Sequence, residues 1–364
     1  MTNPLVSVVM SVFNGEHFVC EAVESILGQT FRDLEFIVVD DGSTDRTASI
    51  LDTYQKSDAR MRVYHQENQG LIESLNRGCL LAQGKYIARM DADDVAVEDR
   101  LMWQVDFMQN HPRIAVLGGA VEWIDANGRS LGIQHTPVTD CEIKSELLRR
   151  NVFWHSTVLM LKEAFVSAGG YRKAVVDAED YDLWLRITEH FQVANLEAVV
   201  VKYRIHPLQV SMRKRRQQTL SKLAVQASAT LRRKGIPDPL DSVTEIPPDL
   251  LVEMGIPEAR QRNEIVLEIR QWIRYMCLAG EHPVAIEAAD QILHSDLEYV
   301  ERWQIADLHL AVARLHWAKG SYRNGIYAAL RAVLTRPAIL ARPLKPLLLR
   351  LRLLPARSGD LPVS

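Results

Sequence analysis

Three aspartates follow a short apolar segment in the first third of the chain. Asp91, Asp93 and Asp94 come directly after Tyr86–Met90, which has the length and composition of a buried strand. Two of these carboxylates can face one small volume, where like charges repel unless a cation lies between them. A hard divalent cation prefers oxygen ligands and keeps positions open for substrate phosphates. The segment alone leaves two interpretations, a metal site and a solvated acidic turn.

Strand-like and helix-like segments alternate through the first ninety residues. Residues 5–13 form an apolar run rich in β-branched residues, and shorter, mostly apolar runs cover 34–39, 61–64 and 86–90. Apolar residues recur at helical spacing within 19–27, 50–54 and 71–82. This alternation is typical of βαβ units and predicts an α/β fold with a Rossmann-like, mostly parallel sheet. After it, the pattern predicts a helix at 98–110 and a strand at 114–117, which leads into Gly118 and Gly119 and continues β-like at 121–124.

Polar residues follow three of these strands, at Ser11–Asn14, Asp40–Asp45 and Asp91–Asp94. In such sheets ligands bind beyond the carboxyl ends of the strands, so the three segments are predicted to share one binding site. A dinucleotide-binding fold would need Gly-x-Gly-x-x-Gly after the first strand. The chain has Ser-Val-Phe-Asn-Gly-Glu there, which excludes that fold.

A second group of acids opens a predicted helix after residue 176. Asp177, Glu179, Asp180 and Asp182 precede Leu183–Ile187, which continues at helical spacing. The helix dipole favours acids at this end by about 0.3–1 kcal/mol each, which accounts for Asp177 and Glu179. One side chain is normally enough to cap a helix, so capping accounts less well for Asp180 and Asp182.

The composition limits the class of protein. The 364 residues are 47% hydrophobic and 24% charged, an ordinary globular mixture that is long enough for two domains. A net charge of −3 argues against a nucleic-acid partner. The four cysteines are far apart in the sequence, and neither a signal peptide nor a membrane-spanning run is recognisable. A cytoplasmic protein is expected.

We divide the chain into an α/β domain at 1–212, a helix and proline-rich linker at 213–262, a helical bundle at 263–335 and a tail at 336–364. One hairpin, Ala311–Leu334 with its turn at Gly320, is similar to a tetratricopeptide hairpin, but three clean repeats are not found. A small helical bundle is therefore the safer prediction.

The tail is rich in leucine and arginine, and Asp360 is the only acid after Arg331. A basic, leucine-rich amphipathic segment is typical of a helix that binds a membrane surface. It is too short and too charged to span a membrane. The alternative is a terminal helix that packs on its own protein.

Taken together, several segments resemble the family-2 glycosyltransferases of GT-A fold, inverting enzymes that use nucleotide-diphospho-sugars. The resemblance covers about the first 210 residues, and the order and spacing of the segments make it specific. The variant at Ala88–Asp94, with Arg100 and Gln104 beyond it, looks like members that build bacterial surface polysaccharides. The matching segments are Val6–Asn14, Ser25–Thr30, Val38–Asp45, Asn76–Gly78, Ala82–Ile87, Met90–Asp94, Glu179–Asp180 and Tyr203–Pro207.

The resemblance implies a nucleotide site at the first two strand ends. Ser11 and Phe13 would lie against the base, and Asp41 would accept a hydrogen bond from it. Asn68 either touches the nucleotide or serves only its own turn. The donor would be UDP- or dTDP-linked.

It also implies a metal site. Asp91 would face the ribose and sugar, and Asp93, the last acid of an Asp-x-Asp motif, would bind Mg²⁺ or Mn²⁺ bridging the diphosphate. His206 would be a further metal ligand, or else a histidine that merely ends a strand before proline. Asp94 is expected to be only an acid at a helix start.

Asp180 would be the general base, because inversion needs one carboxylate opposite the leaving group. His155, Glu179 and Trp184 are candidates for the acceptor side. For His155 a partly buried structural role is the alternative, and for Trp184 a place in the core is preferred.

The predicted function is metal-dependent hexosyl transfer in the assembly of exopolysaccharide, O-antigen or capsule. A polyprenyl-linked glycan at the inner leaflet of the plasma membrane would suit a surface-binding tail. The alternative is a non-catalytic nucleotide-sugar-binding protein whose helical region recruits partners. A nucleotidyltransferase is disfavoured, because Ser11–Gly15 lacks the glycine-rich, basic loop that such an enzyme needs.

Overall fold

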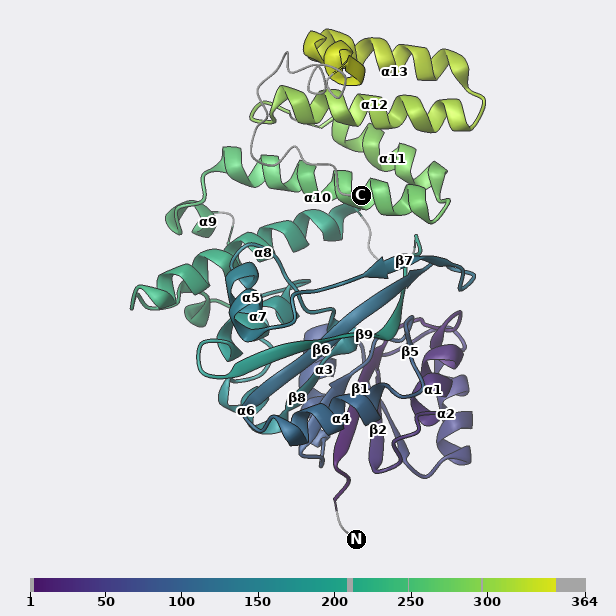
Figure 1. Cartoon of the computed structure of the whole chain (residues 1–364), viewed down its shortest axis with the longest axis vertical. Helices are drawn as coiled ribbons and strands as arrows, with labels where there is room; N and C mark the ends of the chain where they lie inside the picture. Colours follow the sequence, from purple (N-terminus) through teal and green to yellow (C-terminus); the bar gives the residue numbers. More distant parts are fainter. Residues whose placement is uncertain (1–2, 208–211, 248, 296, 345–364) are drawn as a thin grey trace. The chain divides into compact units, whose positions relative to one another are not determined.

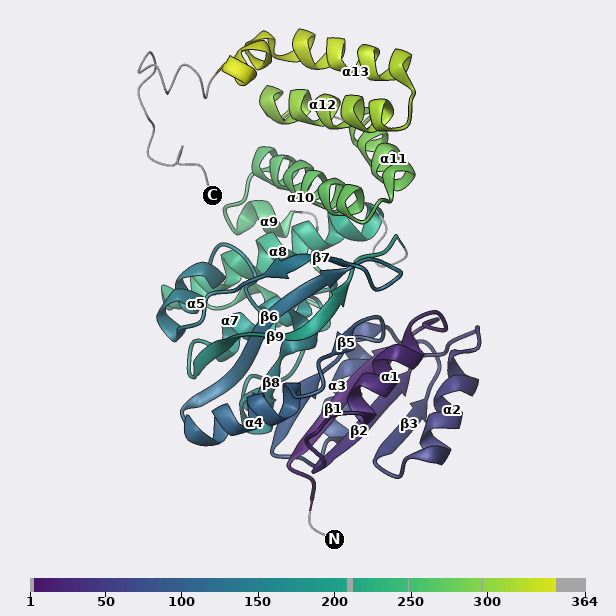
Figure 2. The same ribbon diagram turned by 45° about the vertical axis from the view of Figure 1, so that its right-hand side comes forward.

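The computed structural model describes residues 3–207, 212–247, 249–295 and 297–344. The chain forms two compact units, Met1–Pro257 and Glu258–Ser364, which are described separately. Figures 1 and 2 show the sheet of the first unit and the helical hairpins of the second.

A nine-stranded sheet forms the centre of the first unit, in the order β3-β2-β1-β4-β8-β6-β9-β5, with β7 paired to β6. Neighbouring strands among β1 to β4 pair in parallel, whereas β8 runs antiparallel to β4 and β6. The strands are β1 Val6–Val12, β2 Leu34–Asp40, β3 Met61–His65, β4 Tyr86–Arg89, β5 Val95–Ala96, β6 Ile114–Ile124, β7 Ser130–Gln134, β8 Leu159–Leu161 and β9 Gln192–Arg204.

Helices cover both faces of this sheet (Figure 2). In β1, Val8 and Met10 point to the face covered by α1 Val19–Leu27, α2 Thr47–Ser57 and α4 Arg100–Asn110, and Val9 points to the other face. Strands buried on both faces are expected to be apolar throughout, which explains the continuous apolar runs. The other face is covered by α3 Leu71–Leu81, α5 Asp140–Leu147, α6 Lys162–Ser167, α7 Glu179–Ile187 and α8 Met212–Arg233.

The predicted mostly parallel α/β architecture is confirmed. The predicted strand at 114–117 and its β-like continuation at 121–124 form one continuous strand, Ile114–Ile124. Gly118 and Gly119 do not end it, because they lie inside the sheet where there is no room for a side chain. A Cβ at Gly118 would lie 2.2 Å from Asn195 Oδ1, and one at Gly119 would lie 2.7 Å from Val200. Close backbone approach is a regular use of glycine within strands.

Three short elements complete the first unit: η1 His155–Thr157, η2 Pro239–Ser242 and α9 Leu250–Glu253. Helix α8 and α9 contribute Leu223, Val225 and Leu251 to the same core cluster as α7. The segment after residue 212 is therefore packed into the first unit as far as Pro257.

The second unit consists of two helical hairpins, α10 Glu258–Leu278 with α11 His282–Leu293, and α12 Arg302–Ala318 with α13 Tyr322–Thr335. They are followed by η3 Pro337–Leu344. The turns contain Gly280 (φ 83°) and Gly320 (φ 74°), a backbone conformation that favours glycine. The C-terminal helical region is thus confirmed. In the part of the chain that the structure describes, no helix is both long and apolar enough to cross a bilayer.

Candidate active site

The loops after β1 and β2 are joined by hydrogen bonds at the carboxyl edge of the sheet. The backbone amide of Asn14 donates to Ser43 Oγ at 2.9 Å, and Thr44 N donates to Asn14 Oδ1 at 2.8 Å. Gly15 N donates to Thr47 Oγ1 at 2.8 Å. The strands place these residues side by side because Val12 pairs with Asp40 in the β1–β2 register. The structure thus brings the first two polar segments together.

Asp41 shapes the neighbouring loop. Its buried carboxylate accepts hydrogen bonds from Gln66 Nε2 and Gln69 N at 2.8 Å and from Gly70 N at 2.9 Å. Asn68 lies on the loop that these bonds hold, and its side chain is exposed. Asp41 therefore organises the loop that carries Asn68, a role that its position in the sequence did not indicate.

Ser11 and Phe13 differ in their exposure at this edge. Ser11 is 8% exposed, whereas Phe13 is 52% exposed. A large apolar side chain with half its surface in solvent beside a polar edge is available to stack on a planar ligand.

Asp91 is held by a buried arginine and a serine. Arg89 Nη2 donates to Asp91 Oδ1 at 2.5 Å, and Ser156 Oγ donates to Oδ2 at 2.7 Å. Burial acts to raise the pKa of Asp91, but the positive charge of Arg89 and the Ser156 hydroxyl outweigh it, so the pKa is lowered. Asp91 is therefore a fixed carboxylate anion, whose partners the sequence reasoning did not identify.

Asp93 and His206 meet across the site. Asp93 Oδ2 lies 3.0 Å from His206 Nε2, and Arg204 Nε donates to the Asp93 carbonyl at 2.8 Å. The His206 ring packs on Phe18 with 4.7 Å between ring centroids. Its side chain is nearly buried, whereas that of Asp93 is 26% exposed. The pair is thus formed by the end of β9 and the loop after β4.

The donor atoms of Asp93 and His206 fit a divalent ion. Two ligands in neighbouring positions of an octahedral site, each about 2.1 Å from the ion, lie about 3 Å apart, and Oδ2 and Nε2 are 3.0 Å apart. Among the described residues, no group of three or more His, Cys, Asp or Glu side chains is arranged to hold a metal by itself. The remaining ligands would come from substrate phosphates and water, as is usual for Mg²⁺ sites.

Asp94 does not begin a helix, contrary to the expectation. The two-residue strand β5 follows it, and α4 begins only at Arg100. Asp94 is fully buried, and its Oδ1 accepts from Arg204 N at 2.8 Å. Burial and the charge of Asp93 raise the pKa of Asp94 well above its usual range. Its role is to hold the end of β9 against the Asp91–Asp93 loop.

Glu179 and Asp180 open α7 with their pKa values raised. Asp180 Oδ2 accepts from Asn151 Nδ2 at 2.8 Å. Burial raises the pKa of Asp180 to about 6, with a further contribution from the charge of Asp91. Glu179 is 4% exposed, and its Oε2 has no hydrogen-bond partner among the described residues. Burial and the neighbouring Asp180 raise its pKa to about 8, so near pH 7 Glu179 is mainly neutral and Asp180 mainly charged.

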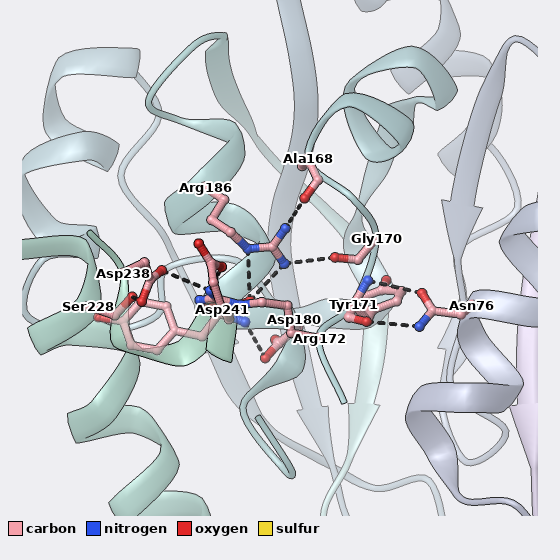
Figure 3. A network of polar contacts seen from close by, with 12 residues as sticks. Asn76, Ala168, Gly170, Tyr171, Arg172, Asp180, Arg186, Ser228, Asp238 and Asp241 are labelled. Carbon is pink, nitrogen blue, oxygen red and sulfur yellow. Dashed lines mark hydrogen bonds and ion pairs between the residues drawn. The ribbon is translucent and has the colours of Figure 1, made fainter. Parts of the chain in front are cut away.

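Asp182 is buried and belongs to an ion-pair network with Arg172 and Arg186, two arginines that Figure 3 shows. Its Oδ2 accepts from Arg172 Nε and Arg186 Nε, both at 2.9 Å. Arg172 Nη1 also reaches Asp238 at 2.8 Å and Asp241 at 2.9 Å. The network joins the loop before α7, α7 itself and η2, and so fixes the helix that carries Asp180.

His155 and Trp184 lie close together, with 6.1 Å between their ring centroids. His155 Nε2 is 2.8 Å from Tyr171 Oη, and burial together with the charge of Arg89 lowers the pKa of His155 to about 3. Trp184 is fully buried, with its ring 5.8 Å from that of Phe153. The burial favours a core role for Trp184, and His155 is a neutral imidazole.

Sequence reasoning missed Arg89, Ser156 and Asn151 as partners of the acidic residues. Arg89 had a detectable signal, because an arginine inside an otherwise apolar strand must find a buried partner. Asn151 and Ser156 had none, since each is an ordinary polar residue in an irregular segment.

Residues 7–169 match the family described as Glycosyl transferase family 2. An uncharacterized glycosyltransferase of Haemophilus influenzae is 34% identical over 57% of this chain and 68% of its own length. The putative glycosyltransferase EpsE of Bacillus subtilis is 34% identical over 56% of this chain and 74% of its own. The amylovoran biosynthesis glycosyltransferase AmsE of Erwinia amylovora is 31% identical over 54% and 75%.

Two solved structures share the fold at 17% identity and a TM-score of 0.51. One is TarS residues 1–349 of S. aureus, covering 89% of this chain and 90% of that one. The other is the mannosyltransferase PcManGT from Pyrobaculum calidifontis in complex with GDP-Man and Mn²⁺, covering 92% and 89%. With its sheet order, its acidic strand ends and these relatives, the chain belongs to the family-2 glycosyltransferases and has the GT-A fold.

Proposed function

We propose that the protein is a metal-dependent, inverting glycosyltransferase that moves a sugar from a nucleotide-diphospho-sugar to an acceptor hydroxyl. One observation carries this proposal. One short segment holds both acids, because Asn151 Nδ2 donates to Asp180 Oδ2 at 2.8 Å and Ser156 Oγ donates to Asp91 Oδ2 at 2.7 Å. We infer from this that the start of α7 and the end of β4 face one volume, with a candidate base from one and acidic sugar- and metal-side residues from the other.

Asp180 suits the role of general base. Inversion is a single in-line displacement, in which the bond from the anomeric carbon to the acceptor oxygen forms as the bond to the diphosphate breaks. The acceptor proton passes to Asp180, whose pKa of about 6 leaves it mostly ionised at neutral pH yet basic enough to take a proton. A neutral Glu179 avoids a second negative charge beside it.

Asp91 and Asp93 would contact different parts of the donor. Asp91, held by Arg89 and Ser156, would accept hydrogen bonds from the ribose or the transferred sugar. Asp93 and His206 would hold Mg²⁺ or Mn²⁺, and such an ion stabilises the charge that develops on the leaving diphosphate. The Mn²⁺ named with PcManGT supports this assignment.

The nucleotide would lie at the edge formed by the first two strand ends. Phe13 is exposed there and can stack on the base, with Ser11 beneath and Asn68 on the loop that Asp41 organises. TarS is described in complex with UDP-GlcNAc and PcManGT with GDP-Man. A donor panel therefore has to extend beyond the UDP- and dTDP-sugars that the sequence suggested.

The biological setting that we propose is surface polysaccharide assembly in the cytoplasm, at the inner face of the plasma membrane. Its support is the amylovoran biosynthesis named for AmsE, a relative 31% identical to this chain. The acceptor would be a polyprenyl-linked glycan. The predicted membrane-binding tail at 336–364 falls mostly on residues 345–364, which lie outside the described residues.

The test is nucleotide-sugar hydrolysis and transfer, measured with UDP-, dTDP- and GDP-sugars, with Mn²⁺ or with chelator. We expect activity with one donor, its loss with chelator and its loss in Asp93→Ala. The matched control is Asp106→Ala, an exposed aspartate on α4. Full activity of Asp93→Ala would overturn the proposal. Donor binding without turnover for any acceptor would instead favour a non-catalytic binding protein.

A further inference from the structure

Helix α13 carries a row of exposed apolar side chains. Gly325, Ala328 and Ala332 form its buried side, and a Cβ at Gly325 would lie 2.3 Å from the ring of Trp317 on α12. On another side, four residues spaced by four positions form one row along the helix. Tyr322 is 67% exposed, Ile326 55%, Leu330 57% and Leu334 77%.

Four large side chains that are each more than half exposed form a continuous apolar row on α13. Contiguous exposed apolar side chains mark interaction sites. Tyr327, beside the row, is 60% exposed as well.

The surroundings of the row are basic. No acidic residue occurs in the sequence between Asp307 and Asp360, a stretch that contains ten lysines and arginines. Arg323, next to Tyr322 on α13, is exposed, and Arg331 Nε donates to Tyr327 Oη at 3.0 Å. Among the described residues, no carboxylate pairs with Arg323, Arg331 or Arg336.

We propose that this face of α13, defined by Tyr322, Ile326, Leu330 and Leu334, docks on an anionic lipid bilayer. An amphipathic helix with an apolar side and flanking arginines binds at the boundary between headgroups and acyl chains. Tyrosines favour this level of the membrane. The arginines would contact the negatively charged lipid phosphates. The sequence around α13 contains no acidic residue that could take the place of those phosphates.

Charge disfavours the two rival occupants. A second copy of the chain would bring Arg323 and Arg331 against the same arginines. Residues 345–364 carry four basic residues and one acid, so they would also bring like charge to this face. Of the second copy, residues 345–364 and an anionic bilayer, only the bilayer has negative charge opposite the arginines. Its acyl chains also bury the apolar row.

The inference does not rest on the proposed reaction, because binding is measured without turnover. The full chain is sedimented with vesicles of phosphatidylcholine containing about 30% phosphatidylglycerol, and with phosphatidylcholine vesicles alone. We expect binding to the anionic vesicles and much weaker binding to the neutral ones. Raised salt should weaken it, because surface attraction is screened within a Debye length.

Two matched pairs of variants test the face. Ile326→Ser combined with Leu330→Ser should raise the lipid concentration for half-binding at least tenfold, whereas Leu80→Ser, at a residue 73% exposed on α3, should not. Arg323→Gln should weaken binding about fivefold, the effect of one surface cation. Its control is Lys56→Gln on α2, also exposed.

A second measurement needs no variant. Amide hydrogen exchange of the unmodified chain should slow in α13 when anionic vesicles are added, and a thermal unfolding curve checks that each variant is folded. Unchanged vesicle binding by the folded double variant, or unchanged exchange in α13, would overturn the inference. A dimer in sedimentation equilibrium that the double variant converts to monomer would assign the face to a second copy instead.

Discussion

Asp93 Oδ2 lies 3.0 Å from His206 Nε2, although 113 positions separate the two residues in the chain. The contact depends on β9, whose last residue, Arg204, donates its backbone N–H to Asp94 and its guanidinium Nε to the Asp93 carbonyl. The carboxylate and the imidazole are thereby held at the spacing of two ligands on one ion. Phe18 limits the movement of the His206 ring from its other side.

Loss of the His206 imidazole should weaken metal binding. We expect His206→Ala to lower the affinity for Mn²⁺, in the presence of a nucleoside diphosphate, by about 10–100-fold, the range found when even the partners of metal ligands are removed. Calorimetry or manganese paramagnetic resonance measures it. His111→Ala, an exposed histidine at the end of α4, is the control. Equal affinity in both variants would remove His206 from the site.

Substitutions of the adjacent acids Glu179 and Asp180 should have different effects on kcat. Asp180→Asn is expected to lower kcat by about 10²–10⁴-fold, the contribution of a general base. Glu179→Gln should retain most activity, because a carboxyl with a pKa of about 8 is already mainly neutral at pH 7. The readout is kcat at saturating donor and acceptor. The reverse order of the two variants would assign the base to Glu179.

The dependence of kcat/KM on pH should reflect the ionisation of the Asp180 carboxyl. Because the base must be ionised, kcat/KM should rise with pH and level off above about 6, the raised pKa of Asp180. The hydrogen bond from Asn151 stabilises the anion and lowers this pKa. Asn151→Ala should therefore move the acidic limb to higher pH. An unmoved limb, with Asn110→Ala on α4 as reference, would contradict the assignment.

The Arg172 network should dominate the stability of the α7 region. Arg172→Met removes the partner that the buried carboxylates of Asp182 and Asp238 share, while Arg186 still pairs with Asp182 and Arg232 with Asp238. The loss should therefore exceed about 1 kcal/mol but stay below the about 3–5 kcal/mol of a buried charge left without any partner. Arg46→Met removes a pair whose arginine is 80% exposed, and should cost less than about 1 kcal/mol. Urea unfolding monitored by circular dichroism measures both. Similar small losses would mean that the network contributes little.

Asp238 should make the first unit acid-sensitive. Burial acts to raise its pKa, but hydrogen bonds from Ser228 and Arg172 outweigh it and lower the pKa from 3.8 to about 2. A lowered folded-state pKa means that the ionised group stabilises the fold above pH 4 and that this contribution is lost between about pH 4 and 2. The size is on the order of 2 kcal/mol. Asp238→Asn should flatten the unfolding free energy across that range, and an unchanged acid limb would contradict it.

The fold could be predicted because its signal is local. The apolar runs of β1, β2 and β4 indicate strands buried on both faces, and the acids after them mark the carboxyl edge of the sheet. The sequence did not explain why Gly118 and Gly119 stand inside β6, because their cause is the close packing of Asn195 and Val200. Close approach between distant segments leaves no local pattern.

The linear order of residues was enough for the family, the α/β class and the candidates Asp91, Asp93, Asp180 and His206, because each belongs to a short motif with its own spacing. Tertiary structure alone decided their partners. Arg89 and Ser156 hold Asp91, Asn151 holds Asp180, and Asp182 is a structural ion-pair residue. The physical reason is that hydrogen bonds and burial depend on how strands are ordered in the sheet, and that order joins residues that no spacing rule connects.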